Sequence, residues 1–136
     1  MARARSRRIQ RFSEVVNFDD FTDGGSTAGT YELPTLVPAN CVVVGWSVEV
    51  LTGFTGDSSA ALLVGISGNT DMYNAAATSV SVFAAGTVGA YCDYDGSGDL
   101  GFSATARTVL LTVTSGSDFG AVDAGKMVIH VAYLEL

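Results

Sequence analysis

The segment of this 136-residue chain whose spacing most resembles a metal site is Asp93-Tyr-Asp-Gly-Ser-Gly-Asp99. Its carboxylates at Asp93, Asp95 and Asp99 would suit a hard cation such as calcium, which takes oxygen ligands from a wrapped loop. The bidentate Glu expected at the twelfth position is absent, because Ala104 stands there. We therefore interpret the segment as an Asp- and Gly-rich turn between two strands, and we predict no metal and no other cofactor.

His130 is the only histidine, and it lies in the middle of the strand-like segment 126–136. A single histidine cannot form a transition-metal site by itself, and no Ser or Cys stands in a recognisable nucleophile motif. We therefore predict that the protein is not an enzyme and that His130 has a structural role. Cys41 and Cys92 are too few for a secreted disulfide framework, so we expect reduced thiols, with a bond between them as the alternative.

The basic residues are concentrated at the start of the chain. Five of the seven precede Glu14, the first of the fourteen acids, so residues 12–136 have two basic residues and a net charge of −12. Such an acidic body repels the phosphates of nucleic acids and membranes, and we predict neither as a direct partner. We expect the N-terminal arm to bind an acidic protein surface, with a solvated terminus as the alternative. The arginines of this arm are Arg3, Arg5, Arg7, Arg8 and Arg11.

The longest strand signal is the segment 41–52, Cys-Val-Val-Val-Gly-Trp-Ser-Val-Glu-Val-Leu-Thr. Its β-branched residues and its period of two are typical of a strand with one buried face. Strict alternation places Gly45, Ser47 and Glu49 on the more polar face. The residues predicted for the buried face are Val42, Val44, Trp46, Val48 and Val50.

Seven or eight short strand-like segments, separated by Gly, Ser and Asp, make up the chain. This pattern indicates a β-sandwich or barrel, because no segment is long enough for a substantial amphipathic helix. A chain of 136 residues fits one domain, and no apolar run approaches the ~20 residues that cross a bilayer. We predict a basic arm over residues 1–11, without the apolar core of a signal peptide, and one all-β domain over residues 12–136.

The last predicted strand, residues 126–136, has apolar side chains on both of its faces. On the face that includes His130, the side chains of Val128, Ala132 and Leu134 would be exposed in a sheet with only one covered side. We therefore predict that these three residues contact another segment, sheet or subunit.

Several short motifs follow one another in a set order. They are Tyr31-Glu-Leu-Pro34, Val37-Pro-Ala-Asn40, the strand Val42–Val50, Leu63-Val-Gly-Ile-Ser-Gly-Asn-Thr-Asp-Met-Tyr73, Thr112-Val-Thr-Ser-Gly-Ser117 and Ala124-Gly-Lys-Met-Val-Ile-His-Val-Ala-Tyr133. In this order, over residues 12–136, they resemble the small capsid decoration (cement) proteins that are encoded among the head genes of tailed bacteriophages. The arginine arm has no counterpart in this resemblance.

The resemblance implies a single-domain, jelly-roll-like β-sandwich of about eight strands. It also implies a structural virion protein that is assembled in the host cytoplasm, binds the outside of the capsid shell and cements neighbouring major capsid protein subunits. We further expect a homo-oligomer, either a dimer or a trimer. The alternative function is a jelly-roll adhesin or carbohydrate-binding module, in which the loop Asp93–Asp99 would hold calcium.

Overall fold

The computed structural model describes residues 9–74, 78–90 and 102–136, and within them the chain is all-β apart from two single-turn 3₁₀ helices. The predicted fold class is confirmed. No described helix is long and apolar enough to span a membrane. In chain order the elements are β1 (Ile9–Asn17), η1 (Phe18–Asp20), β2 (Thr22–Asp23), β3 (Ala28–Glu32), β4 (Cys41–Thr55), β5 (Ala60–Gly65), β6 (Val80–Ser81), β7 (Gly86–Ala90), β8 (Phe102–Ser103), β9 (Leu110–Ser115), η3 (Phe119–Ala121) and β10 (Ala124–Glu135).

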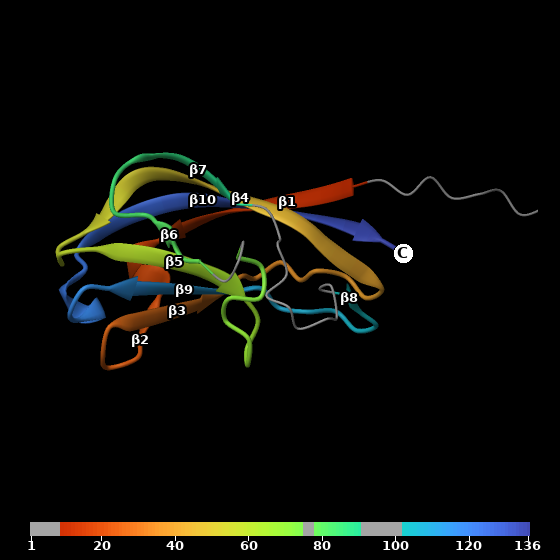
Figure 1. Ribbon diagram of the computed structural model, residues 1–136, viewed down its shortest axis with the longest axis horizontal. Coiled ribbons are helices and arrows are strands. Elements are labelled where there is room, and N and C mark those ends of the chain that lie inside the picture. Colours follow the sequence, from red (N-terminus) through yellow and green to blue (C-terminus); the bar gives the residue numbers. More distant parts are fainter. Residues whose placement is uncertain (1–8, 75–77, 91–101) are drawn as a thin grey trace, which may run out of the picture.

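The strands form two antiparallel sheets that pack face to face as a sandwich (Figure 1). Sheet A has the order β1-β10-β4-β7, with the short β8 also paired to β4, and sheet B has the order β2-β3-β9-β5-β6. The pairing is nested, since β1 pairs with β10, β3 with β9, β4 with β7 and β5 with β6. Nested antiparallel pairing of eight strands across two sheets is the jelly-roll topology that the family resemblance implied.

A β-bulge interrupts the regular alternation of β4, the longest strand. Opposite β10, Gly45 pairs with Ala132, whereas Val43 pairs with Tyr133. Val44 is therefore the extra residue of the bulge. Because side chains alternate between the two faces of a strand, one extra residue reverses which positions face the core on its N-terminal side.

The bulge corrects one expectation from the sequence. Val42 and Val44 were predicted to share the buried face of Trp46, but they are only half-buried and lie on the opposite side of sheet A. Cys41 and Val43 occupy the core in their place. The residues of the predicted face that are buried as expected are Trp46, Val48 and Val50.

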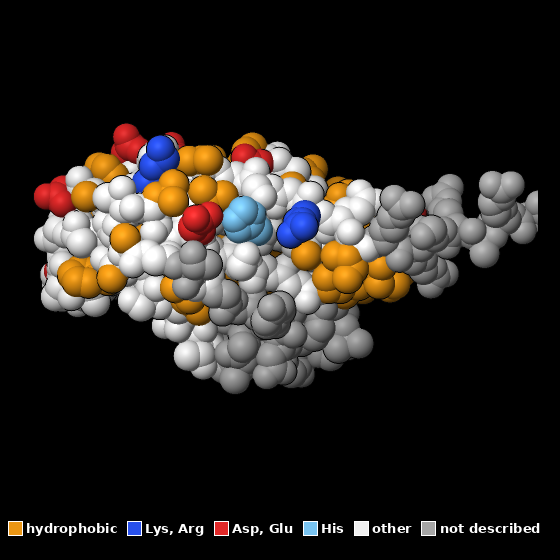
Figure 2. Space-filling view, turned by 90° about the horizontal axis from the view of Figure 1, so that it is seen from above, with side chains coloured by type: hydrophobic (Ala, Val, Ile, Leu, Met, Phe, Trp, Pro, Cys, Tyr) orange, Lys and Arg blue, Asp and Glu red, His pale blue; other side chains and the backbone are white. Residues whose placement is uncertain are grey.

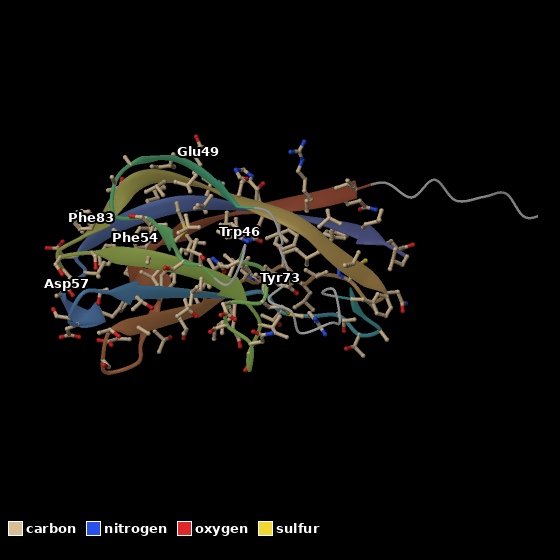
Figure 3. All side chains as sticks on the ribbon, in the orientation of Figure 1. Trp46, Glu49, Phe54, Asp57, Tyr73 and Phe83 are labelled. Atoms are coloured by element: carbon tan, nitrogen blue, oxygen red, sulfur yellow. The ribbon has the colours of Figure 1, made fainter. Side chains whose placement is uncertain are left out.

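The hydrophobic core lies between the two sheets. Near the β4–β5 turn, the ring of Phe21 packs against those of Phe54 and Phe119, with centroids 6.0 and 5.8 Å away. In the middle of the sandwich, Trp46 Nε1 donates a hydrogen bond of 2.6 Å to the carbonyl of Tyr73 (Figure 3). These contacts join the inner faces of the two sheets.

Candidate functional site

The outer face of sheet A, which is the side turned away from sheet B, carries every predicted site residue that the structure describes. On the edge of this sheet, Arg11 of β1 lies opposite Ala132 of β10. Val15 likewise lies opposite Val128. Directly opposed residues of an antiparallel pair point to the same side, and Leu134 shares that side because it lies two residues beyond Ala132. The structure thus brings the last arginine of the arm together with the three predicted interface residues.

The other predicted site residues lie outside the described part of the chain, so their roles stay predictions. Within the described ranges, no group of three or more His, Cys, Asp or Glu side chains is arranged to hold a metal ion. The residues outside these ranges are Arg3, Arg5, Arg7, Arg8, Asp93, Asp95 and Asp99, together with Cys92.

Apolar side chains occupy much of the outer face of sheet A. Ile9 is 66% exposed and Val15 is 55% exposed on β1, and Leu51 of β4 is 47% exposed. Figure 2 shows hydrophobic side chains on this side of the molecule in several groups, with single charged side chains between them. Such a surface is suited to a protein partner. The half-buried apolar residues that complete it are Val42, Val44, Val128 and Leu134.

An open hollow of about 390 Å³ lies in this outer face. It forms where Gly45, at the bulge, has no side chain and Ala132 beside it has only a methyl group. Arg11 and Ile9 line the hollow on the β1 side. The hollow therefore combines an apolar wall with a guanidinium, which is an arrangement that can receive a partner side chain and pair with a neighbouring carboxylate.

His130 lies on the same face and is half-buried. Its Nδ1 lies 2.6 Å from the hydroxyl oxygen of Ser13. On the neighbouring strand β4, its register partner is Ser47. Among the described residues, no carboxylate accepts a hydrogen bond from the other ring nitrogen, an arrangement that a hydrolytic triad would require. The contact joins β1 to β10, in agreement with the structural role predicted for this histidine.

The outer face of sheet A is poor in acidic residues, although the whole chain has a net charge of −7. On β1, β4 and β10, Glu49 points to this side, whereas Glu14 and Glu135 occupy positions that face the other way. The carboxylate of Glu14 accepts a hydrogen bond from Thr35 instead. An acidic partner would therefore meet little repulsion on this face, where Arg11 is exposed.

The acids near the β4–β5 turn lie too far away to pair with the arm of the same chain. β1 begins at the end of sheet A where β4 also begins, and Asp57 follows the other end of β4 (Figures 1 and 3). The 15 residues of β4 span about 45 Å. The eight residues before β1 reach at most about 28 Å. The arginines of these eight residues therefore cannot pair with Asp57 of the same chain.

Asp57 itself organises the loops at its end of the sandwich, a role that sequence reasoning missed. Its carboxylate accepts hydrogen bonds from the backbone N–H groups of Ser58, Ser117 and Asp118 at 2.7–2.9 Å. The hydroxyl of Ser117 adds a further bond of 2.9 Å. The backbone donors from Asp118, Ser117 and Ser58 hold the pKa of Asp57 well below its ordinary value.

We expect Asp57→Asn to lower the melting temperature at pH 7, because an amide replaces the charged acceptor of three backbone N–H groups. The pKa of Asp57 is lower in the folded state than in the unfolded state, where it is about 4. The ionised carboxylate therefore stabilises the fold at pH values above about 4, and this contribution is lost as the pH falls below that value. The difference in melting temperature between wild type and variant should therefore shrink below about pH 4. Thermal melts of both proteins between pH 7 and pH 3 test this prediction. The control is Asp19→Asn, because Asp19 is an exposed acid. An equal shift at pH 7 and pH 3 would contradict this account.

Comparison with known proteins shows a likeness in fold. No family model matches the sequence, and no curated protein matches it at a significant level. Among solved structures, the chain is similar to a chain of the "Cyanophage Pam1 capsid asymmetric unit", with 16% sequence identity and a TM-score of 0.57. The match covers 100% of this chain and 92% of that chain. The two therefore share a fold over the whole of this chain and most of the other.

Proposed function

We propose that this protein is a structural component of a tailed-phage virion, which binds the outside of the capsid shell and links neighbouring major capsid protein subunits. The observation that carries the proposal is the likeness to a chain of a cyanophage capsid asymmetric unit, which extends over the whole of this sequence. The apolar, acid-poor outer face of sheet A supports it, because such a face suits a large protein partner better than a small substrate.

Attachment would use two parts of the molecule that lie next to each other. The outer face of sheet A supplies apolar contact area and the hollow beside Arg11. The arm before Ile9 adds four arginines, whose guanidinium groups form bidentate pairs with carboxylates. Since the arm reaches at most about 28 Å beyond β1, it could contact a second capsid subunit while the sandwich rests on the first.

The test is co-sedimentation with undecorated capsids, comparing the full chain with a variant that lacks residues 2–8. The deletion ends before Ile9 because β1 begins there, so the sandwich should stay folded. We expect the truncated protein to bind more weakly than the full chain. A variant with lysine at positions 3, 5, 7 and 8 should lose less, because charge remains while bidentate geometry is lost. Raised salt should weaken the exposed part of the attachment.

A pair of matched alanine variants tests the face in the same assay. Ala132→Glu places a carboxylate in the hollow of sheet A, and we expect it to weaken capsid binding. Ala61→Glu is the control, because Ala61 is also a half-buried alanine, on the outer face of sheet B. Equal binding by both variants would contradict the use of the sheet A face.

The remaining outcomes separate the parts of the proposal. If the variant without residues 2–8 binds capsids as tightly as the full chain, the arm has no role in attachment. If no form binds capsids under any salt condition, the virion assignment is wrong, and binding to glycans with and without calcium becomes the measurement that tests the adhesin alternative.

A further inference from the structure

β1 forms a long open edge of sheet A. Its nine residues pair with β10 on one side, and no other described strand pairs with them. Within the described residues, the backbone groups of residues 9–16 that point away from β10 have no hydrogen-bond partner. The side chain of Thr35 donates to the Glu14 carboxylate and not to the backbone of β1. The edge therefore presents a row of backbone donors and acceptors that another strand could pair with.

The edges of sheet B are built differently. They are β2 and β6, which have two residues each, and such short edge strands give an incoming strand little to pair with. β1 is also nearly free of the charges that commonly block an edge, since Arg11 and Glu14 are its only charged residues. Exposed apolar side chains at Ile9 and Val15 lie on either side of Arg11.

We propose that β1 pairs antiparallel with β1 of a second copy of this chain, so that the two sheets A become one continuous sheet across a two-fold axis at Phe12. Seven residues of each strand would face one another and form about six to eight backbone hydrogen bonds. In this register, the opposed residues of the two copies are Ile9 and Val15, Gln10 and Glu14, Arg11 and Ser13, and Phe12 and Phe12.

The side chains of β1 favour this register over its neighbours. It opposes apolar residues with apolar ones, and Gln10 can donate to Glu14, which are the cross-strand pairs that stabilise sheets. Moving the register by two residues in one direction places Arg11 opposite Arg11 of the second copy. Moving it by two in the other direction places Phe12 opposite Glu14, and a further two opposes Glu14 with itself. Shifts of one residue would oppose the outer face of one copy to the inner face of the other.

Charge also favours antiparallel over parallel pairing. In a parallel pair, the two segments that precede β1 would run side by side and bring eight arginines together. Antiparallel pairing places the starts of the two β1 strands at opposite ends of the strand pair.

The test measures the mass of the full chain in solution by sedimentation over a wide concentration range. We expect a dimer, and hydrogen exchange of the amides of residues 9–16 should slow as the dimer forms. Ile9→Lys alone, or Val15→Glu alone, should each weaken dimerisation at least tenfold in Kd. The variant with both substitutions should recover much of the affinity, because each introduced cation then opposes an introduced carboxylate across the two-fold axis. Both residues are exposed, so the sandwich should stay folded.

Leu51→Glu is the matched control, because Leu51 is a similarly exposed apolar residue on β4, away from the edge. It should leave the dimer unchanged. A chain that is monomeric at every concentration would overturn the proposal. So would a dimer in which the amides of residues 9–16 exchange as in the monomer, or a double variant that dimerises no better than the single ones. These measurements need no capsid, so their outcome is independent of the proposed virion role.

Discussion

Replacing Trp46 with alanine is expected to lower the free energy of unfolding by about 3–5 kcal/mol, since truncating a large buried aromatic side chain removes apolar burial and leaves a cavity. Trp46 is 3% exposed and lies at the centre of β4, level with Val131 of β10. Its indole also donates a 2.6 Å hydrogen bond to the carbonyl of Tyr73. Tyr73 in turn donates its backbone N–H to Val64 of β5. Trp46 therefore connects sheet A to the segment that follows β5.

The Trp46→Phe variant separates the two contributions. Phenylalanine keeps most of the apolar contact but cannot donate to Tyr73, so we expect a smaller loss of about 1–3 kcal/mol. Urea denaturation followed by far-UV circular dichroism measures both variants without depending on tryptophan fluorescence. Equal losses for the two variants would assign the whole effect to the hydrogen bond, and a negligible loss for alanine would contradict the central position of Trp46.

Replacing Asn74 should cause a loss of similar size, although this residue is polar. Asn74 is fully buried. Its Oδ1 accepts a 2.7 Å hydrogen bond from Val64 N–H, and its amide nitrogen donates to the carbonyls of Leu62 and Thr78 at 3.4 and 3.0 Å. The side-chain amide of Asn74 thus bonds the backbone of β5 where the short β6 no longer pairs with it. We expect Asn74→Leu to cost about 3 kcal/mol or more, because each buried polar group left unpaired costs about 1–3 kcal/mol.

Asn74→Asp gives this prediction a distinct pH signature. The carboxylate keeps an acceptor for Val64 but loses both donors, and burial favours its neutral form. Because its folded-state pKa would lie above the unfolded value of about 4, the variant should lose stability relative to wild type as the pH rises above 4. Denaturation at several pH values measures this loss, and Asn74→Leu should show no such dependence. A pH-independent difference for Asn74→Asp would contradict the burial of this side chain.

The roles of Asn74 and Asp57 could not have been predicted from the chain alone. Each lies in a loop segment rich in small polar residues, where Asn and Asp are common as turn residues. Asp57 binds backbone groups 60 and 61 residues away. Asn74 binds backbone groups of Leu62, Val64 and Thr78, which only the return of the chain past β5 brings to its side chain. Nothing in local composition shows which of many loop carboxylates or amides will meet such donors.

The candidate surface was partly predictable. The alternation of the last strand placed Val128, Ala132 and Leu134 on one face, and the structure confirms that they share the outer side of sheet A. Arg11 was assigned to a separate arm, yet it lies within β1, directly opposite Ala132. The strand begins at Ile9 rather than at Phe12, because pairing with β10 extends it. Their joint use as an interface stays a prediction.

The sequence by itself determined the class of the fold and the uneven distribution of charge. A period of two in apolar residues, frequent β-branched residues and Gly- and Asp-rich breaks are local properties, and they suffice to predict an all-β sandwich. Only the tertiary structure decided which side chains face outward on β4, because the bulge at Val44 depends on pairing with Tyr133 and Ala132, some 90 residues away. It likewise decided that, among the described strands, β1 lies at the edge of its sheet. Strand order and register arise from contacts between distant segments, and a shift of one residue exchanges the two faces of a strand.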